Sequence, residues 1–346
     1  MADRKITMKD VAERAGVSLS TVSYVLSGTR TISEATRAHI LKTMDELDFH
    51  PNAVARALAS KRTRVIALIL SPEDRGLGLS EMEFVRGASE AARALDHHLV
   101  LLTQGMDSEA ELAYLKRQGL VDGVILMEVH LHDPRVRILQ HLGFPFALLG
   151  RPDPTLGLRS VDIDFDQTIE TVLRELGALG HRRVGLVNQS RATWQSGYGP
   201  TVRVQESFET WAARLGMTGT SAFSAPTPRD GWEACQALVQ GPGRPSALVV
   251  MNDRALPGVL QNLATQGLRI PGDISVVSAV TSAPAAEMMV PALTSADAPS
   301  QELARAAVAN LVASIERETE VQSASDPGSL LIPCKFTVRA STGSCS

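Results

Sequence analysis

The chain is poor in features that mark secreted and membrane proteins. It has 3 cysteines in 346 residues, and Cys235, Cys334 and Cys345 are scattered without the spacing of a disulfide framework or a zinc site. No apolar signal-like segment opens the chain, and no apolar run approaches the roughly 20 residues that a membrane-spanning helix needs. We therefore expect a cytoplasmic protein with no membrane partner, in which the cysteines are structural or incidental.

The sequence also lacks common catalytic motifs. It contains no Gly-x-Ser-x-Gly elbow, no P-loop and no Gly-x-Gly-x-x-Gly fingerprint. The pairs His97-His98 and His130-x-His132 have no Cys, His or Glu partners at metal-ligand spacing, so they are interpreted as surface histidines. We expect no catalysis, no metal and no cofactor.

The chain also lacks a large excess of charge of either sign, since its net charge is only −4. Residues 1–62 hold ten Lys and Arg against seven Asp and Glu, a net +3, which leaves −7 for the remaining chain. This mild partition would attract phosphate groups to the N-terminal part alone.

What the chain does have, at its N-terminus, is the pattern of two short helices joined by a tight turn. Lys9 to Ala15 has helical apolar spacing, and Gly16 can adopt the positive φ that a sharp turn needs. Ser18 suits the N-cap of a second helix, which extends to Ser27. Helical spacing on its buried face is shown by Val22, Val25 and Leu26.

The remaining surface of this second helix is small and polar, which suits base edges and phosphates. Its candidate DNA contacts are Ser18, Leu19, Ser20, Thr21, Ser23 and Tyr24. The pattern is that of a helix-turn-helix, although short αα-hairpins also occur in proteins that bind no DNA.

A third helix would complete a compact all-α head. Ser33 suits its N-cap, and its predicted buried stripe comprises Ile40, Leu41, Met44 and Leu47. Helix N-termini favour phosphate oxygens, so further candidate phosphate contacts are Thr7, Thr21 and Thr36. A role as helix caps or exposed helix residues explains these threonines equally well.

Residues 52–60 follow Pro51 and consist of good helix formers, but a helix this short is marginal in water. We expect a hinge that folds on DNA and inserts Leu58 between base steps in the minor groove. Asn52 and Arg56 are the other candidate DNA contacts of this segment. A plain helical linker is the alternative.

From residue 64 onward, apolar runs alternate with amphipathic helical patterns. The first series places strands at Val65–Leu70, His98–Thr103, Gly123–Met127 and Phe146–Leu149, with helices at Met82–Leu95 and Glu109–Gln118. The second places strands at Val184–Asn188, Ala247–Met251 and Ile274–Ser278, with helices at Gln205–Leu215, Gly231–Val239 and Leu256–Gln266. Repeated βαβ units predict parallel sheets covered on both faces.

The chain resembles the lactose-repressor family of bacterial transcription regulators. The segments that carry the resemblance are KDVAERAGVSLSTVSYVLSG, ISEATRAHIL, HPNAVARALAS, GRPD, LGHRRVGLVN, RPSALVVMNDRALPG, RIPGDISVVS, PALTS and VRASTG, in this order over nearly the whole chain. The resemblance implies a small all-α helix-turn-helix head and a two-lobed α/β sensor like the periplasmic binding proteins, with parallel sheets in Rossmann-like lobes.

On this basis we expect three parts. The head takes residues 1–50, the hinge or linker 51–63, and the sensor 64–346. Within the sensor, the first lobe takes approximately residues 64–158 plus 294–326, and the second lobe takes 159–293 plus 327–346.

Ligands of open α/β lobes bind at the carboxyl ends of the strands. Candidate effector contacts at these ends are Ser71, Glu128, Arg151, Asn188, Asn252, Asp253 and Thr281. By resemblance, Asn252-Asp253 is an effector-proximal pair and Arg151 part of a frequent Gly-Arg, with a turn and an inter-lobe salt bridge as the alternatives. Candidate stacking platforms, unless they are core residues, are Trp194, Tyr198 and Trp232.

Two departures from the family pattern concern the effector. Relatives place an arginine three residues before a Gly-aromatic pair, whereas Arg203 lies four residues before Ser207-Phe208, a rotation of roughly 100° on a helix. Arg203 is therefore a candidate effector contact whose direction the sequence leaves open. Residues 278–282 also lack the Asp-Asp pair that often holds sugar hydroxyls, which weakens the sugar hypothesis.

We expect a ligand-responsive transcription factor, most simply a repressor, that binds a palindromic operator as a homodimer. Leu19, Ser20 and Tyr24 would enter the major groove, and Arg30 is a candidate bidentate contact to guanine. The last strand is followed by no heptad repeat, so a coiled-coil tetramer is not expected. The effector would be a sugar, a nucleoside or a phosphorylated metabolite, and a regulator that answers to no effector is the further alternative. The alternatives are a solute-binding protein of the same two-lobed fold and an enzyme built on it.

Overall fold

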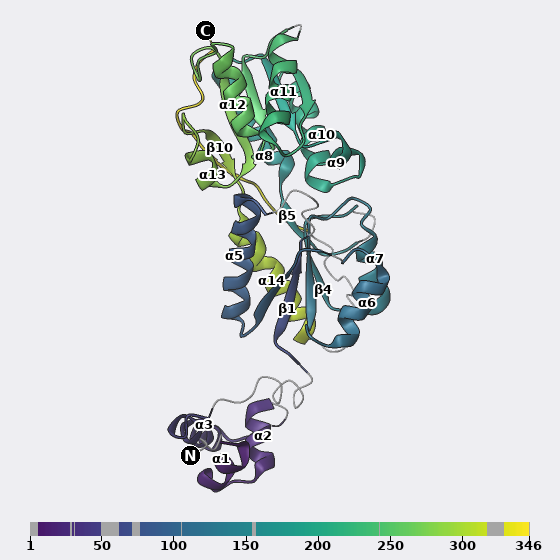
Figure 1. Ribbon diagram of the computed structural model, residues 1–346, viewed down its shortest axis with the longest axis vertical. Coiled ribbons are helices and arrows are strands. Elements are labelled where there is room, and N and C mark those ends of the chain that lie inside the picture. The colour runs from purple at the N-terminus through teal and green to yellow at the C-terminus, as the bar shows by residue number, and fades with distance from the viewer. Residues whose placement is uncertain are drawn as a thin grey trace. The chain divides into compact units, whose positions relative to one another are not determined.

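The computed structural model describes residues 6–27, 30, 32–49, 62–70, 77–104, 106–153, 157–241, 243–316 and 329–345. Its contacts divide the chain into one unit of Met1–Val65 with Tyr114–Asp122 and a second of Ile66–Ala113 with Gly123–Ser346. The first contains the head. The second contains most of an α/β sensor (Figure 1).

The head consists of α1 (Met8–Ala15), α2 (Leu19–Ser27) and α3 (Glu34–Glu46). A capping box joins Thr7 to Asp10 at the start of α1, and Gly16 ends that helix in the left-handed conformation with φ 65°. The Oγ of Ser33 accepts a hydrogen bond from the Thr36 N–H, so the N-cap predicted for the third helix is present.

One apolar cluster joins the three helices. Its buried members are Val11, Ala12, Ala15, Val22, Val25, Ile40 and Met44. Leu41, predicted to share the buried stripe of the third helix, is instead 46% exposed. One helical residue rotates the side chain by about 100°, which moves Leu41 off the stripe that Ile40 and Met44 form.

Two six-stranded sheets form the sensor, with strand orders β11-β5-β4-β3-β1-β2 and β12-β10-β9-β8-β6-β7. The first sheet, which defines the first lobe, contains β1 (Val65–Ile69), β2 (His98–Leu102), β3 (Gly123–Met127), β4 (Phe146–Leu149), β5 (Val161–Ile163) and β11 (Leu330–Ile332). The second, which defines the second lobe, contains β6 (Arg183–Asn188), β7 (Thr218–Phe223), β8 (Ala247–Val250), β9 (Ser275–Thr281), β10 (Thr294–Asp297) and β12 (Lys335–Thr337). β12 is antiparallel to β10, whereas β6, β8 and β9 pair in parallel, as predicted.

Helices cover both sheets (Figure 1). The helices of the first lobe are α5 (Leu79–Ala94), α6 (Glu109–Gln118), α7 (Pro134–Leu142) and α14 (Ser300–Glu316). Those of the second are α8 (Phe165–Ala178), α9 (Arg191–Gln195), α10 (Gly199–Arg214), α11 (Pro228–Gln240), α12 (Leu256–Thr265) and α13 (Ala283–Glu287). α5 packs on α14, α8 packs on α10, and α11 packs on α12.

The predicted borders between the lobes need correction. β5 follows the predicted border at residue 158 but pairs with β4 in the first sheet, and β11 also belongs there. β10 pairs with β9 in the second sheet, so residues 294–297 belong to the second lobe. These strands have only three or four residues each, and such short runs give no periodicity that shows which sheet they join.

Candidate functional site

The exposed face of α2 in the head carries the predicted DNA contacts. Ser18, Leu19 and Ser20 are exposed, and Leu19 is 49% accessible. Thr21, Ser23 and Tyr24 are half-buried. An exposed leucine among hydroxyls is available to meet a partner surface.

Ser18 also organises the start of α2. Its Oγ accepts the Thr21 N–H at 3.1 Å, and it lies 2.7 Å from the hydroxyls of both Ser20 and Thr21. Arg30 lies 5.5 Å from the centroid of the Tyr24 ring. The guanidinium and the ring are therefore neighbours on the surface, which agrees with both contacting one ligand.

The other predicted DNA contacts divide into two groups. Thr7 and Thr36 take part in the capping hydrogen bonds of α1 and α3, so their capping role is present. Asn52, Arg56 and Leu58 lie outside the described residues, as does the predicted effector contact Ser71.

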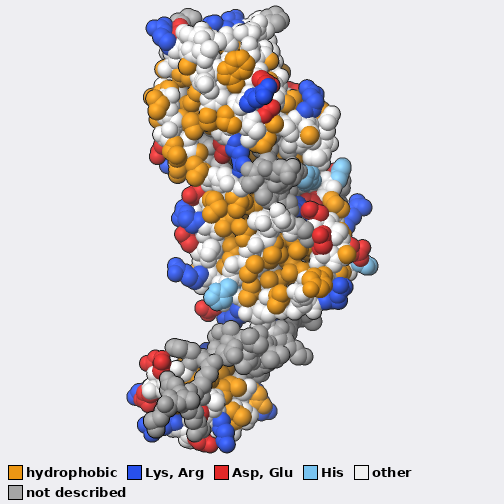
Figure 2. All heavy atoms as spheres, viewed as in Figure 1, with side chains coloured by type: hydrophobic (Ala, Val, Ile, Leu, Met, Phe, Trp, Pro, Cys, Tyr) orange, Lys and Arg blue, Asp and Glu red, His pale blue; other side chains and the backbone are white. Residues whose placement is uncertain are grey.

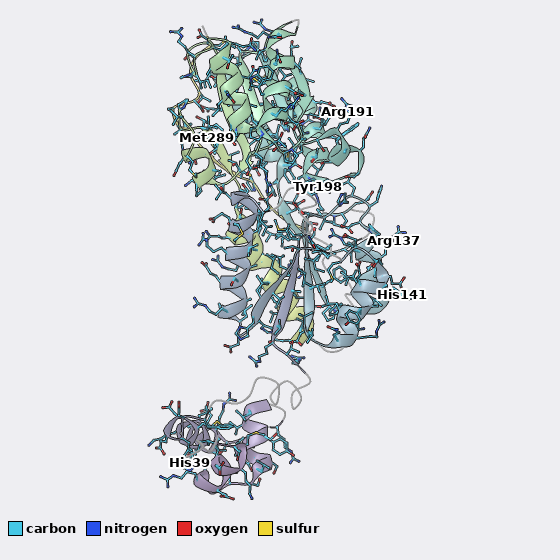
Figure 3. The ribbon with its side chains drawn as sticks, viewed as in Figure 1. His39, Arg137, His141, Arg191, Tyr198 and Met289 are labelled. Carbon is cyan, nitrogen blue, oxygen red and sulfur yellow. The ribbon has the colours of Figure 1, made fainter. Side chains whose placement is uncertain are left out.

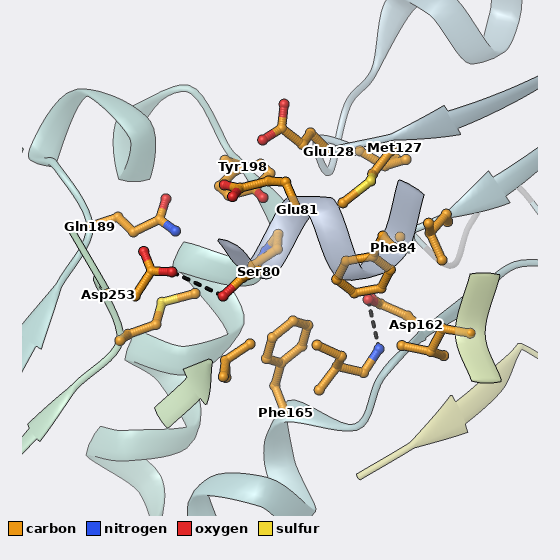
Figure 4. A pocket seen from close by; sticks show the side chains of 18 residues that line it. Ser80, Glu81, Phe84, Met127, Glu128, Asp162, Phe165, Gln189, Tyr198 and Asp253 are labelled. Carbon is orange, nitrogen blue, oxygen red and sulfur yellow. Dashed lines mark hydrogen bonds between the residues drawn. The ribbon is translucent and has the colours of Figure 1, made fainter. Parts of the chain in front are cut away.

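A cavity lies between the two lobes of the sensor, with about 800 Å³ of empty space that is partly open to solvent (Figure 4). Both sheets contribute to its wall. The lining residues are Ser80, Glu81, Phe84, Met127, Glu128, Val129, Leu149, Gly150, Asp162, Ile163, Phe165, Gln189, Tyr198, Pro200, Met251, Asp253, Val280 and Leu303.

Three predicted effector contacts line this cavity. Glu128 follows β3 and has φ 56°, and Asp253 follows β8 after two residues. Tyr198 precedes α10 and lies where the two lobes meet (Figure 3). The rule that ligands meet the carboxyl ends of parallel strands therefore agrees with the position of the cavity.

Contacts across the cavity join the lobes directly. The Ser80 hydroxyl at the start of α5 donates to Oδ2 of Asp253 at 2.9 Å (Figure 4). Arg254 lies 3.8 Å from the Glu81 carboxylate. The lobes are thus held together by side chains that a ligand can contact or displace.

Asp162 is the most buried carboxylate of the wall, with 5% exposure. Its oxygens accept the backbone N–H groups of Ile163 at 2.9 Å and Arg151 at 3.2 Å. Burial raises the pKa of the Asp162 carboxyl to about 6, and the charge of Arg203, whose Nη1 is 3.7 Å away, opposes the rise.

Arg203 and Arg151 do not line the cavity but lie behind it. Nη2 of Arg203 donates to the Arg151 carbonyl at 2.6 Å, so this arginine joins α10 to the loop after β4. α10 begins at Gly199, not near Gln205, and Ser207-Phe208 is in its middle. The helix predicted at Gln205–Leu215 therefore begins six residues earlier, and Arg203 lies within it.

Three further predicted contacts lie behind the wall. The amide of Asn188 donates to Gln205 Oε1 at 3.2 Å, and the amide of Asn252 donates to the Ser224 carbonyl at 3.0 Å. Asn188 thus ties the end of β6 to α10, and Asn252 holds the loop after β7. Thr281 is fully buried.

Of the three candidate stacking platforms, only Tyr198 lines the cavity. Trp194 is 37% exposed and packs on Phe223, with ring centroids 5.8 Å apart. His181 contacts Ser246, Ser275 and the Gly343 carbonyl, so its role is structural.

Sequence reasoning missed several wall residues, chiefly Ser80, Glu81, Phe84, Asp162, Phe165 and Gln189. Gln189 directly follows β6, so the strand-end rule could have found it. Glu81 and Ser80 come from a helix start, where acidic and hydroxyl residues are ordinary capping residues. Asp162 lies on a three-residue strand that no pattern revealed.

Within the described ranges, no group of three or more His, Cys, Asp and Glu side chains is arranged to hold a metal ion. No helix in the same part of the chain is long and apolar enough to cross a membrane.

Both the head and the sensor match known protein families. Residues 7–52 match the bacterial regulatory proteins of the lacI family, and residues 173–342 match the periplasmic binding protein-like domain. The HTH-type transcriptional regulator CelR of Thermobifida fusca is 30% identical over 347 aligned residues, covering 98% of both chains.

Solved structures show the same fold. A structure described as a transcriptional regulator CelR-cellobiose complex has a TM-score of 0.71 at 27% identity, covering 97% of this chain and 99% of that one. The lac repressor dimer bound to operator and an anti-inducer has a TM-score of 0.77 at 22% identity, covering 98% and 100%. The head, the two-lobed sensor and these relatives lead to one conclusion: the chain belongs to the lacI family of bacterial regulatory proteins and is a DNA-binding transcriptional regulator, not an enzyme.

Proposed function

We propose that this regulator represses transcription as a homodimer on a palindromic operator, and that a small hydroxyl-rich effector in the inter-lobe cavity controls it. The head corresponds to residues 1–50, the hinge to 51–63 and the sensor to 64–346. The observation that carries the proposal is the cavity itself, because both lobes line it and side chains join across it. A ligand there changes how firmly the lobes hold together.

The chemistry of the wall supports a hydroxyl-rich ligand. Family relatives often use an Asp-Asp pair after the sixth strand, which this chain lacks, but carboxylates from other elements take its place. Glu81 comes from α5, Asp162 from β5 and Asp253 from the loop after β8. Carboxylate oxygens accept hydroxyl hydrogens, and the wall offers the Phe84 and Phe165 rings for apolar contact. Cellobiose, which is bound in the structure of the regulator CelR, is a ligand of this kind.

Coupling to DNA follows from the contacts across the cavity. An effector that competes with the Ser80–Asp253 hydrogen bond favours an open arrangement, and one that bridges the lobes favours a closed one. The equilibrium shifts only by the difference in affinity between the two arrangements. The hinge would convey this difference to the head, with Leu58 wedged at the operator centre.

Exposed apolar side chains of the sensor support a dimer. They gather over α5 and α13 on the face seen in Figure 2. The most exposed of them on α5, β2 and the α13–β10 segment are Leu79, Met82, Val100, Met288 and Val290. A second copy of the chain that covers such a face would remove it from water, which favours association.

The test compares two exposed leucines of the head. Leu19→Ala on α2 should weaken binding to a selected palindromic DNA about tenfold or more, as a contact to a base edge would. Leu41→Ala on α3 is the matched control, since Leu41 is 46% exposed and has no proposed DNA contact. Fluorescence anisotropy measures both affinities, and sedimentation gives the oligomeric state. Equal affinities for the two variants, or a monomer on DNA, would contradict the proposal.

A further inference from the structure

The described wall of the inter-lobe cavity carries charge of one sign. Its ionisable side chains are Glu81, Glu128, Asp162 and Asp253, and no lysine, arginine or histidine is among the described residues that line it. The other side chains of the wall are apolar, apart from Ser80, Gln189 and Tyr198, which carry uncharged polar groups. Such a wall attracts cations and repels phosphate and carboxylate groups.

Arginines behind the wall compensate part of this charge. Arg203 lies 3.7 Å from Asp162, and Arg254 lies 3.8 Å from Glu81. The charge of Arg135 also acts on Glu128, but Arg135 is shared with Asp133, whose Oδ2 is 2.6 Å from its Nη2. None of these arginines is among the residues that line the cavity.

Asp253 differs from Glu81 and Asp162, each of which has an arginine within 4.0 Å. Its Oδ2 accepts the Ser80 hydroxyl at 2.9 Å, and in the described parts of the chain no Lys, Arg or His nitrogen lies within 4.0 Å of its carboxylate. The side chain lies between Ser80 and Gln189 at one end of the cavity, and Phe84 and Phe165 lie towards the other (Figure 4). The cavity therefore has one end with a carboxylate that no described cation pairs with and one end with two rings.

We propose that the effector is a hydroxyl-rich compound that carries a protonated amine, and that Asp253 is the counter-charge of this ammonium group. The inference rests on the proposed function, since it takes the cavity as the effector site. The ammonium donates to Asp253 and to Gln189 Oε1, and neighbouring hydroxyls donate to Glu81. The rings of Phe84 and Phe165 cover the apolar face of the skeleton. A phosphorylated or carboxylate-bearing analogue would bring further negative charge to a wall whose described ionisable residues are all acidic.

The experiment uses the full chain and compounds of similar size that differ in charge. One series is cellobiose, the β-1,4-linked disaccharide of glucosamine, which carries one amine on each ring, and cellobionate, whose reducing end is an open-chain carboxylate. The other is glucose, glucosamine and gluconate. Calorimetric titration should show an amine bound about tenfold tighter than its neutral parent, the preference expected for one close charge pair, and no binding of the acid. Asp253→Asn should remove this preference while it retains an acceptor for Ser80.

Glu233→Gln is the matched control, because Glu233 is an exposed carboxylate of the same lobe, 3.1 Å from Arg229. It should leave the amine preference intact, and the melting temperature verifies that each variant is folded. A neutral or acidic member that binds as tightly as its amine overturns the inference, as does a complete lack of binding in both series.

The operator distinguishes this inference from the proposed function. A neutral or acidic compound that binds the cavity and changes operator affinity leaves the function standing and overturns the amine. An amine that binds through Asp253 without any effect on operator affinity supports the ligand class and contradicts the function.

Discussion

Replacing Asp162 by Asn should change how the stability of the sensor depends on pH. Burial raises the pKa of this carboxyl to about 6, against 3.8 for the ordinary group. The folded chain therefore binds the proton more tightly than the unfolded chain does. Stability is greatest below about pH 4 for this group alone, and it falls as the pH rises from about 4 to 6. Above pH 6 the loss is complete.

The magnitude follows from the shift of about two pKa units. At about 1.4 kcal/mol per unit, the Asp162 charge costs roughly 3 kcal/mol of unfolding free energy at neutral pH. Asn cannot ionise, so the variant should lack this part of the pH dependence. The free energy of unfolding of the variant is also lowered by an amount that does not depend on pH, because one of the N–H groups of Arg151 and Ile163 loses its acceptor oxygen. The slope is therefore the informative quantity.

Urea unfolding of both chains from pH 4 to 7, followed by fluorescence, measures the slope. The difference between the two chains should change by roughly 2.5 kcal/mol across this range, because part of the full effect lies below pH 4, in the direction that favours the variant at neutral pH. Carboxyls with a lowered pKa, such as Asp273 at about 2, affect both chains equally and cancel. Parallel pH profiles for the two chains would refute the reasoning.

Four further substitutions test the head, the hinge and the sensor core. Ile40→Ala removes a fully buried side chain and should destabilise the head by about 2–5 kcal/mol, seen as lost operator binding with ligand binding retained; unchanged operator binding would contradict this. Arg30→Ala should relax base preference at one operator position in a binding-site selection, and a uniform loss over all sequences would make it a phosphate contact. Leu58→Ala should weaken operator binding strongly and leave effector binding intact by titration, whereas equal loss of both would contradict the hinge. Gly258→Ala places a Cβ 1.6 Å from the Pro228 carbonyl oxygen and should lower the free energy of unfolding by about 3 kcal/mol in urea, and an unchanged midpoint would mean that α11 and α12 shift apart freely.

Much of the fold could be predicted because burial imposes a periodic pattern. The strand Gly123–Met127 is fully buried and reads as an apolar run, so its position was predicted without error. β7 has the sequence TGTSAF and lies at a sheet edge with most side chains exposed, so no apolar pattern marks it. The start of α10 was missed because its signal, Pro200 in the first turn, comes before the apolar stripe begins.

The site was only partly predictable for a related reason. Glu128 and Asp253 follow strands that are buried apolar runs from end to end, so the general rule for α/β sheets located them. Glu81 lies in the first turn of α5, and Asp162 lies on a three-residue strand. Only the packing of these elements in the folded chain brings the two carboxylates to the cavity. Asn188 and Asn252 stand at strand ends like the wall residues, but each turns its amide to a partner behind the wall. The sequence does not indicate which way a side chain turns.

The order of strands near the C-terminus limits how the sensor can be dissected. β11 adds an edge to the sheet of one lobe and β12 adds an edge to the sheet of the other, and residues 329–345 contain both. The stretch after β12 also bonds to the second lobe, where the Val276 N–H donates to the Ser341 carbonyl. A stop codon just before residue 329 would strip a border strand from both sheets at once, so the two halves of the sensor cannot be obtained as independent pieces by shortening the gene from its end.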